Sequence, residues 1–173
     1  MTPPPSRIRI SPETGDAEWA QLSIGQGPVD VTVVGVSRFI QAIGNDGVMM
    51  PPTFEAELGA DPPGGERVMT AEVARKLQQA MLRVVREGTG RSALPALRGT
   101  GWQLGGKTGT AQVPGQPDNG WFAGLLFDPS GNPRFTVVAF VERGGPGSGA
   151  PTAIAAAVAR ELATNAPALV AEP

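Results

Sequence analysis

Residues 105–112 read Gly-Gly-Lys-Thr-Gly-Thr-Ala-Gln and place one lysine between glycines and hydroxyl groups. Side chains alternate between the two faces of an extended strand, so Thr108 and Thr110 point one way while Lys107 and Gly109 take the other register. A glycine inside a strand often marks a place where a ligand or another backbone comes close. The stretch therefore indicates either a ligand-binding strand or an ordinary surface edge strand with a solubilising lysine.

The ligand-binding interpretation has a definite chemistry. A peptide-like ligand that ends in a carboxylate can add to such a strand through backbone hydrogen bonds. Its carboxylate can then accept charge-assisted and hydroxyl hydrogen bonds from Lys107, Thr108 and Thr110. These eight residues do not decide between the two interpretations, and the rest of the chain must do so.

The composition limits the chemistry that the chain can perform. Its 173 residues, the length of one domain, include no cysteine and no histidine. This excludes thiol nucleophiles, histidine bases, disulfides and thiolate or imidazole metal sites, so we expect no metal and no cofactor. The net charge of −2, with no basic stripe, offers no footprint for nucleic acid. The sequence also contains no apolar run long enough to span a bilayer.

The spacing of apolar residues predicts an α+β fold. Thr32 and Thr70 stand as N-caps ahead of helical periodicity, and Pro151 stands in the first turn of a third periodic segment, lined by Ile154, Val158 and Leu162. The predicted helices cover 32–43, 70–88 and 151–163, and the predicted strands cover 102–112, 121–127 and 135–142. A tight turn at 128–133 makes the three strands an antiparallel meander packed with helices.

The other segments carry weaker signals. Residues 7–10 alternate in a way that fits a short edge strand or no regular structure. We expect an irregular N-terminal segment over 1–20, an extended stretch over 48–58, a loop over 59–66 and a tail over 164–173.

A nucleotide-binding alternative fails on its context. Gly101, four intervening residues and Gly106-Lys107-Thr108 formally satisfy the P-loop pattern. A P-loop needs a helix directly after its lysine, because the N-terminal amides of that helix hold phosphate. Residues 109–117 contain two glycines and two prolines, and no helix can run through them.

Several stretches, in the same order, resemble the penicillin-binding proteins, the D,D-transpeptidases related to serine β-lactamases. The resemblance covers roughly residues 21–163. It is carried by Ser-Ile-Gly-Gln-Gly and the following segment at 23–36, Asn-Asp-Gly at 45–47 with Pro51-Pro52, Val-Val-Arg-Glu-Gly-Thr-Gly at 84–90, Gly-Lys-Thr-Gly-Thr-Ala-Gln at 106–112 and Trp-Phe-Ala-Gly at 121–124.

The resemblance implies a partial transpeptidase fold and a set of roles for the lysine strand. Lys107 would stabilise the terminal carboxylate of a peptidoglycan stem peptide or a β-lactam and assist proton transfer, and Thr108 and Thr110 would hydrogen-bond that carboxylate. Gly109 would let the ligand backbone lie along the strand. The N–H of Thr110 would be one oxyanion-hole donor, so Lys107 and Thr110 are the expected catalytic residues. The implied location is the bacterial cell envelope, at the outer face of the cytoplasmic membrane.

The chain departs from the family at its nucleophile. Such enzymes use Ser-x-x-Lys, then Ser-x-Asn, then Lys-Thr-Gly. The lysines at 76 and 107 are preceded three residues earlier by Val73 and Leu104, so the chain has no Ser-x-x-Lys. Residues 130–132 read Ser-Gly-Asn, but they follow the lysine strand and have the composition of a turn.

We therefore expect the C-terminal portion of a transpeptidase that is inactive alone. Its expected partner is the missing N-terminal half of the domain or a self-associated copy. The alternative is a non-catalytic binding module derived from the same fold.

Overall fold

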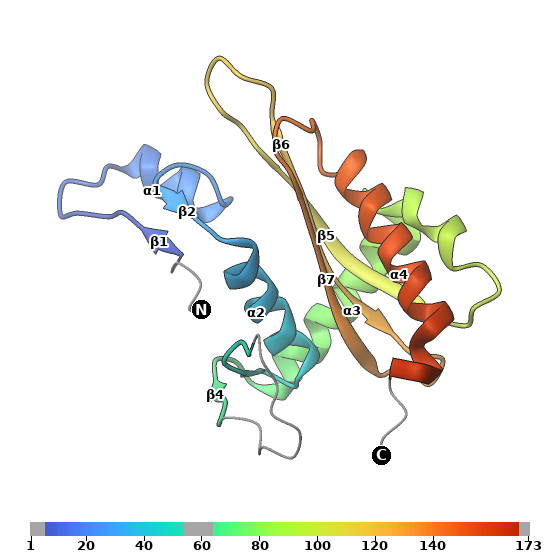
Figure 1. The fold of residues 1–173 in the computed structure, drawn as a ribbon. Helices are drawn as coiled ribbons and strands as arrows, with labels where there is room; N and C mark the ends of the chain where they lie inside the picture. Colours follow the sequence, from blue (N-terminus) through green and yellow to red (C-terminus); the bar gives the residue numbers. More distant parts are fainter. Residues whose placement is uncertain (1–5, 54–63, 170–173) are drawn as a thin grey trace.

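The computed structural model describes residues 6–53 and 64–169, and its centre is a three-stranded antiparallel sheet (Figure 1). The strands β5 (Gln103–Ala111), β6 (Asn119–Phe127) and β7 (Pro133–Val141) lie in the order β5-β6-β7. Asp128 closes the tight turn between β6 and β7, where its carboxylate accepts from the N–H groups of Ser130 and Asn132 at 2.9 Å each. The predicted α+β fold and its meander are confirmed.

Helices lie on both faces of this sheet. The long helix α4 (Ala150–Leu169) runs along one face, and α2 (Val33–Gly44) and α3 (Ala71–Glu87) pack on the other. A 3₁₀ helix, η1 (Arg91–Leu97), follows α3 and packs against α4.

The predicted N-caps of α2 and α3 are confirmed. The hydroxyl of Thr32 accepts from Gly35 N at 3.0 Å, and that of Thr70 accepts from Val73 N at 3.3 Å. Each hydroxyl satisfies one of the backbone donors that a helix leaves unpaired at its start.

The last helix is longer than predicted, and Leu162 of its predicted apolar line packs against the core. It continues to Leu169 instead of ending near Ala163, and residues 170–173 of the expected tail lie outside the described residues. No glycine or proline interrupts residues 163–166, and Thr164 and Asn165 hydrogen-bond back to Arg160 O and Glu161 Oε1. Ile154 and Val158 are 47% and 45% exposed. The buried stripe consists of the small residues Ala155, Ala156, Ala159 and Ala163.

The N-terminal segment is more regular than the sequence suggested. The short edge strand that residues 7–10 allow is present as β1 (Arg7–Ile8), and the expectation of an irregular segment over 1–20 is wrong where α1 (Asp16–Ser23) begins. β1 pairs with β2 (Val29–Asp30), and α1 begins where the Glu18 carboxylate accepts from Gly15 N at 3.1 Å. None of the residues of α1 is buried, so α1 has no apolar face that a pattern could reveal.

A second small hairpin lies beyond α2. Its strands are β3 (Val48–Met49) and β4 (Glu66–Arg67). Residues 54–63 of the expected extended stretch and loop lie outside the described residues.

The sheet face under α4 is closed. Phe122 and Leu126 of β6 have no exposed surface and lie in one cluster with Ala139 and the alanines of α4. The Phe122 ring fills the space above Gly106, where an added Cβ would come within 2.3 Å of Phe122 Cζ. The lysine strand therefore rests on this packed core.

The opposite face is covered over only part of its length. Near the turn that joins β6 to β7, Leu125 and Phe127 pack against α2 and α3. Toward the other end of β6, Trp121 and Phe140 form an aromatic pair with ring centroids 4.5 Å apart, and Phe140 stays 39% exposed.

Candidate functional site

A cleft of about 790 Å³ opens between α2, α3 and the incompletely covered sheet face. Its floor carries Lys107, Gly109 and Trp121, and its apolar walls include Phe39 and Met81. Among the described residues that line it, Lys107 is the only basic one and Asp30 the only acidic one. The cleft thus combines a mostly apolar wall with one cation on its strand.

The lysine of β5 is exposed, and the neighbouring hydroxyl is buried. The Lys107 ammonium donates to the carbonyl of Thr108. The side chain of Thr108 is buried, and its Oγ1 lies 2.6 Å from Oγ1 of Thr89, in the turn after α3. A threonine hydroxyl has one donor and two acceptor sites. If Thr89 donates in this pair, the Thr108 proton remains free to bind a ligand oxygen.

Thr110 joins three parts of the chain. Its Oγ1 accepts from Gly147 N at 3.4 Å, and its carbonyl accepts from Nε2 of Gln26 at 2.9 Å. The donor to this carbonyl does not belong to β6, which is the only strand that pairs with β5 in the part of the chain that the structure describes, so the Thr110 carbonyl faces the other, free edge of β5. In an antiparallel strand the N–H and C=O of one residue point to the same side, and residues two apart share that side. The N–H and C=O groups of Thr108 and Thr110 therefore face the free edge together.

Gly109 has no side chain, so β5 does not protrude into the cleft beside the Trp121–Phe140 aromatic pair. A Cβ at this position would lie 3.3 Å from Cβ of Trp121, its cross-strand partner. The structure thus brings the four predicted residues Lys107, Thr108, Gly109 and Thr110 together on one edge strand at the cleft.

Two contacts at the site were not expected from the sequence. Gln26 belongs to the Gly-Gln-Gly stretch that carries part of the resemblance, yet its side chain reaches the lysine strand 84 residues away. Thr89, in the Gly-Thr-Gly stretch at 88–90, forms a hydrogen bond with the Thr108 hydroxyl. Each of these two residues stands between two glycines, a pattern that favours a turn but does not show where the polar side chain points.

Two other sequence motifs, the P-loop pattern and Ser-x-Asn at 130–132, have no part in the candidate site. β5 continues to Ala111 and is followed by a loop instead of a helix, which rules out a P-loop. Ser130 lies in the β6–β7 turn, as expected for a chance match to Ser-x-Asn.

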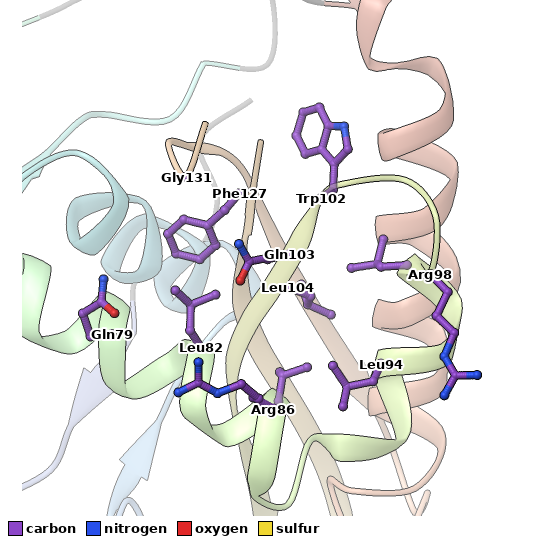
Figure 2. A pocket seen from close by; sticks show the side chains of 12 residues that line it. Gln79, Leu82, Arg86, Leu94, Arg98, Trp102, Gln103, Leu104, Phe127 and Gly131 are labelled. Carbon is purple, nitrogen blue, oxygen red and sulfur yellow. The ribbon is translucent and has the colours of Figure 1, made fainter. Parts of the chain in front are cut away.

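A second cavity, of about 440 Å³, lies beside the other end of β5, between α3 and η1 (Figure 2). Leu82, Leu94 and Trp102 form part of its apolar lining. Figure 2 shows the side chains of Arg86 and Arg98 turned in different directions, so they do not converge on one anion.

Within residues 6–53 and 64–169, no group of three or more acidic side chains is placed to hold a metal ion. No helix in that part of the chain is long and apolar enough to cross a membrane.

Comparison with known proteins identifies the family. The family model of the penicillin binding protein transpeptidase domain matches residues 9–164. The chain is 33% identical over 129 residues to the probable peptidoglycan D,D-transpeptidase PenA of Neisseria meningitidis, covering 72% of the chain and 21% of that protein. It is 34% identical over 142 residues to the penicillin-binding protein PbpB of Mycobacterium tuberculosis, covering 69% and 20%.

Solved structures agree with this result. The transpeptidase domain of Burkholderia pseudomallei penicillin-binding protein 3 has a TM-score of 0.72 and 30% identity, covering 97% of this chain and 51% of that one. Penicillin-binding protein A of M. tuberculosis, in its imipenem acyl-enzyme complex, has a TM-score of 0.66 and 25% identity, covering 86% and 35%.

The chain belongs to the penicillin-binding protein transpeptidase family. It spans about a fifth of the length of these curated relatives and about half of the solved Burkholderia domain.

Proposed function

We propose that this chain is the C-terminal portion of a serine D,D-transpeptidase that cross-links peptidoglycan stem peptides and binds β-lactams. The observation that carries the proposal is the free edge of β5, where Lys107 and the backbone groups of Thr108 and Thr110 lie beside an apolar cleft. Added strands bind through such edges, and a carboxylate gains charge-assisted bonds from an ammonium group.

Each residue of the edge has a distinct role in this proposal. Lys107 attracts the terminal carboxylate of the stem peptide, and the hydroxyls of Thr108 and Thr110 donate to it. When a serine attacks the penultimate D-Ala carbonyl, the N–H of Thr110 stabilises the oxyanion. Loss of one such donor raises the barrier by about 2.7–4 kcal/mol where this has been measured. The terminal D-Ala leaves, and the acyl-enzyme then passes its acyl group to an amine.

The acylating serine must come from another segment, because this chain has no Ser-x-x-Lys. A polypeptide that carries Ser-x-x-Lys and Ser-x-Asn would approach the cleft and supply the serine, its lysine base and the second oxyanion donor. The complete enzyme would act at the outer face of the cytoplasmic membrane, where its peptidoglycan substrate lies.

Intact-mass spectrometry with penicillin tests this assignment. None of the seven serines precedes a lysine by three positions, so the chain alone should show no covalent adduct. The same chain mixed with the complementing half of a relative should yield one adduct per complex, carried by the complementing polypeptide. A stoichiometric adduct on the chain alone would reveal a nucleophile that this assignment lacks.

The alternative is a non-catalytic binding module, and one observation favours it: the Lys-Thr-Gly-Thr strand is present in a chain that carries no Ser-x-x-Lys. A chain that binds a peptide ending in D-Ala-D-Ala, yet yields no adduct with any complementing half, would support the module.

A further inference from the structure

Residues 6–31, here called the N-terminal unit, lie beside the sheet and line the cleft together with β5. Within the described residues, the only hydrogen bond from this unit to the sheet runs from Gln26 Nε2 to the carbonyl of Thr110, at 2.9 Å. The unit is otherwise joined to α2 by the chain at 31–32 and by the Ser6 hydroxyl, which accepts from Thr32 N at 3.2 Å. In Figure 1 it lies on the side of the sheet opposite α4.

The local backbone holds this amide in place. Gly25 and Gly27 have φ angles of 76° and 77°, in the left-handed region that glycine enters without strain. Between them, Gln26 N donates to Gln21 O at 2.9 Å, which ties the loop to the end of α1. The loop thus projects one side-chain amide toward the edge of β5.

The acceptor that Gln26 occupies is one that an added strand needs. A peptide that extends a sheet edge donates its N–H groups to the outward carbonyls of alternate residues, which here are Thr108 and Thr110. We propose that Gln26 is a latch: its side-chain N–H takes the place of the ligand's backbone N–H on Thr110, and binding of a peptide displaces the N-terminal unit from the edge of β5. This inference rests on the proposed function, because it assumes that the ligand adds to that edge.

Displacement of the latch would also open the cleft. Ile24 and Val31 of the N-terminal unit form part of the cleft wall. The hinge would lie at 31–32, directly before the N-cap of α2. The ligand gains its hydrogen bond to the Thr110 carbonyl only when the Gln26 hydrogen bond breaks. The latch should therefore weaken ligand binding by about two- to twelvefold, the factor that corresponds to one net hydrogen bond.

Hydrogen exchange without ligand tests the latch itself. Gln26→Ala removes the donor, and Gln26→Glu keeps the shape but presents an acceptor-only carboxylate. Both variants should raise amide exchange across residues 12–31 by about two- to twelvefold. Ser23→Ala is the matched control, because the Ser23 hydroxyl donates only to Ala20 O within the unit. Unchanged exchange in both Gln26 variants would overturn the latch.

Exchange and affinity measured with an acetylated peptide ending in D-Ala-D-Ala test the competition. In the wild-type chain the peptide should slow exchange across 106–112 and speed it across 12–31, and Gln26→Ala should bind it more tightly. Slower exchange in both segments, or weaker binding by Gln26→Ala, would show that Gln26 assists the ligand and would overturn the proposal. If the peptide slows amide exchange across 106–112 in neither the wild-type chain nor Gln26→Ala, both the proposed function and the competition are contradicted. The ligand-free experiment still decides whether Gln26 holds the N-terminal unit.

Discussion

The two faces of the central sheet differ in how much of their apolar surface this chain covers. On the α4 face, Phe122 and Leu126 are fully buried, and small helix residues fit closely against them. On the cleft face, Phe140 of the aromatic pair remains 39% exposed, and Phe39 of α2, which lines the same cleft, is 48% exposed. The α4 face thus packs closely beneath the lysine strand, whereas the cleft face leaves an open, mostly apolar cleft beside it.

Replacement of the lysine should have the largest effect, and only on chemistry. In an enzyme reconstituted with a complementing half, Lys107→Ala should lower the acylation rate by about two to four orders of magnitude, the range for loss of a positioned proton-transfer group. Thermal unfolding should not change, because the side chain is exposed. Lys76→Ala is the control, since that lysine pairs with Glu72 on the solvent side of α3. Equal losses of stability and activity in Lys107→Ala would make the lysine structural.

Removal of one aromatic side chain from each face tests the comparison directly. Phe122→Ala should lower the free energy of unfolding by about 3–5 kcal/mol, as for a fully buried ring. Trp121→Ala, at the neighbouring position on the cleft face, should cost clearly less, because its ring is only partly covered. Denaturant unfolding of both variants gives the two numbers. Equal losses would mean that the cleft face is as well packed as the other.

The uncovered face predicts that the chain will not behave as an ordinary monomer. Within the described residues, β7 pairs only with β6, so its other edge has no strand partner, and such edges promote association. Each large apolar side chain left on the cleft face forgoes roughly 1.5–3 kcal/mol of burial. Sedimentation should detect self-association at micromolar concentration, and a hydrophobic dye should bind until a complementing half is added. A dye-silent, cooperative monomer would favour the stand-alone module.

The smallest effect is expected at the hydroxyl pair of Thr89 and Thr108, which links the turn after α3 to β5. Thr89→Val keeps the shape of the side chain but removes the partner of the buried Thr108 hydroxyl. It should lower the free energy of unfolding by roughly 0.5–1.5 kcal/mol. The same loss at the ligand site would raise the Kd of the peptide by about two- to twelvefold. Parallel unfolding and binding measurements separate these effects. An unchanged affinity would place the Thr108 hydroxyl outside the ligand site.

The sequence predicted those parts of the fold that depend on local chemistry. Hydroxyl caps at Thr32 and Thr70 and the turn at 128–133 act within a few residues, and all three were located correctly. The helix α1 was not predicted, because none of its residues is buried and its sequence therefore shows no clear apolar face. The apolar line of Ile154, Val158 and Leu162 did not identify the packing face of α4, because the close approach of helix and sheet favours alanine there, and Leu162 alone of the three packs against the core.

The position of the candidate site on β5 was predictable to the same extent, whereas the roles of its residues stay predictions. The four residues of β5 follow from one contiguous pattern, and the structure brings them to the cleft. The contacts that Gln26 and Thr89 make with β5 span 84 and 19 residues. Such contacts depend on how α1 and α3 are placed in three dimensions, which no local pattern encodes.

The close fit of the Phe122 ring over Gly106 limits how these two positions can evolve. A larger residue at 106 would collide with the ring, and a smaller residue at 122 would leave a cavity under the lysine strand. Each single substitution therefore passes through a less stable intermediate, whereas the two together can compensate because they share one space. Among related chains, positions 106 and 122 should change as a pair or stay as they are, even though 16 residues separate them in the sequence.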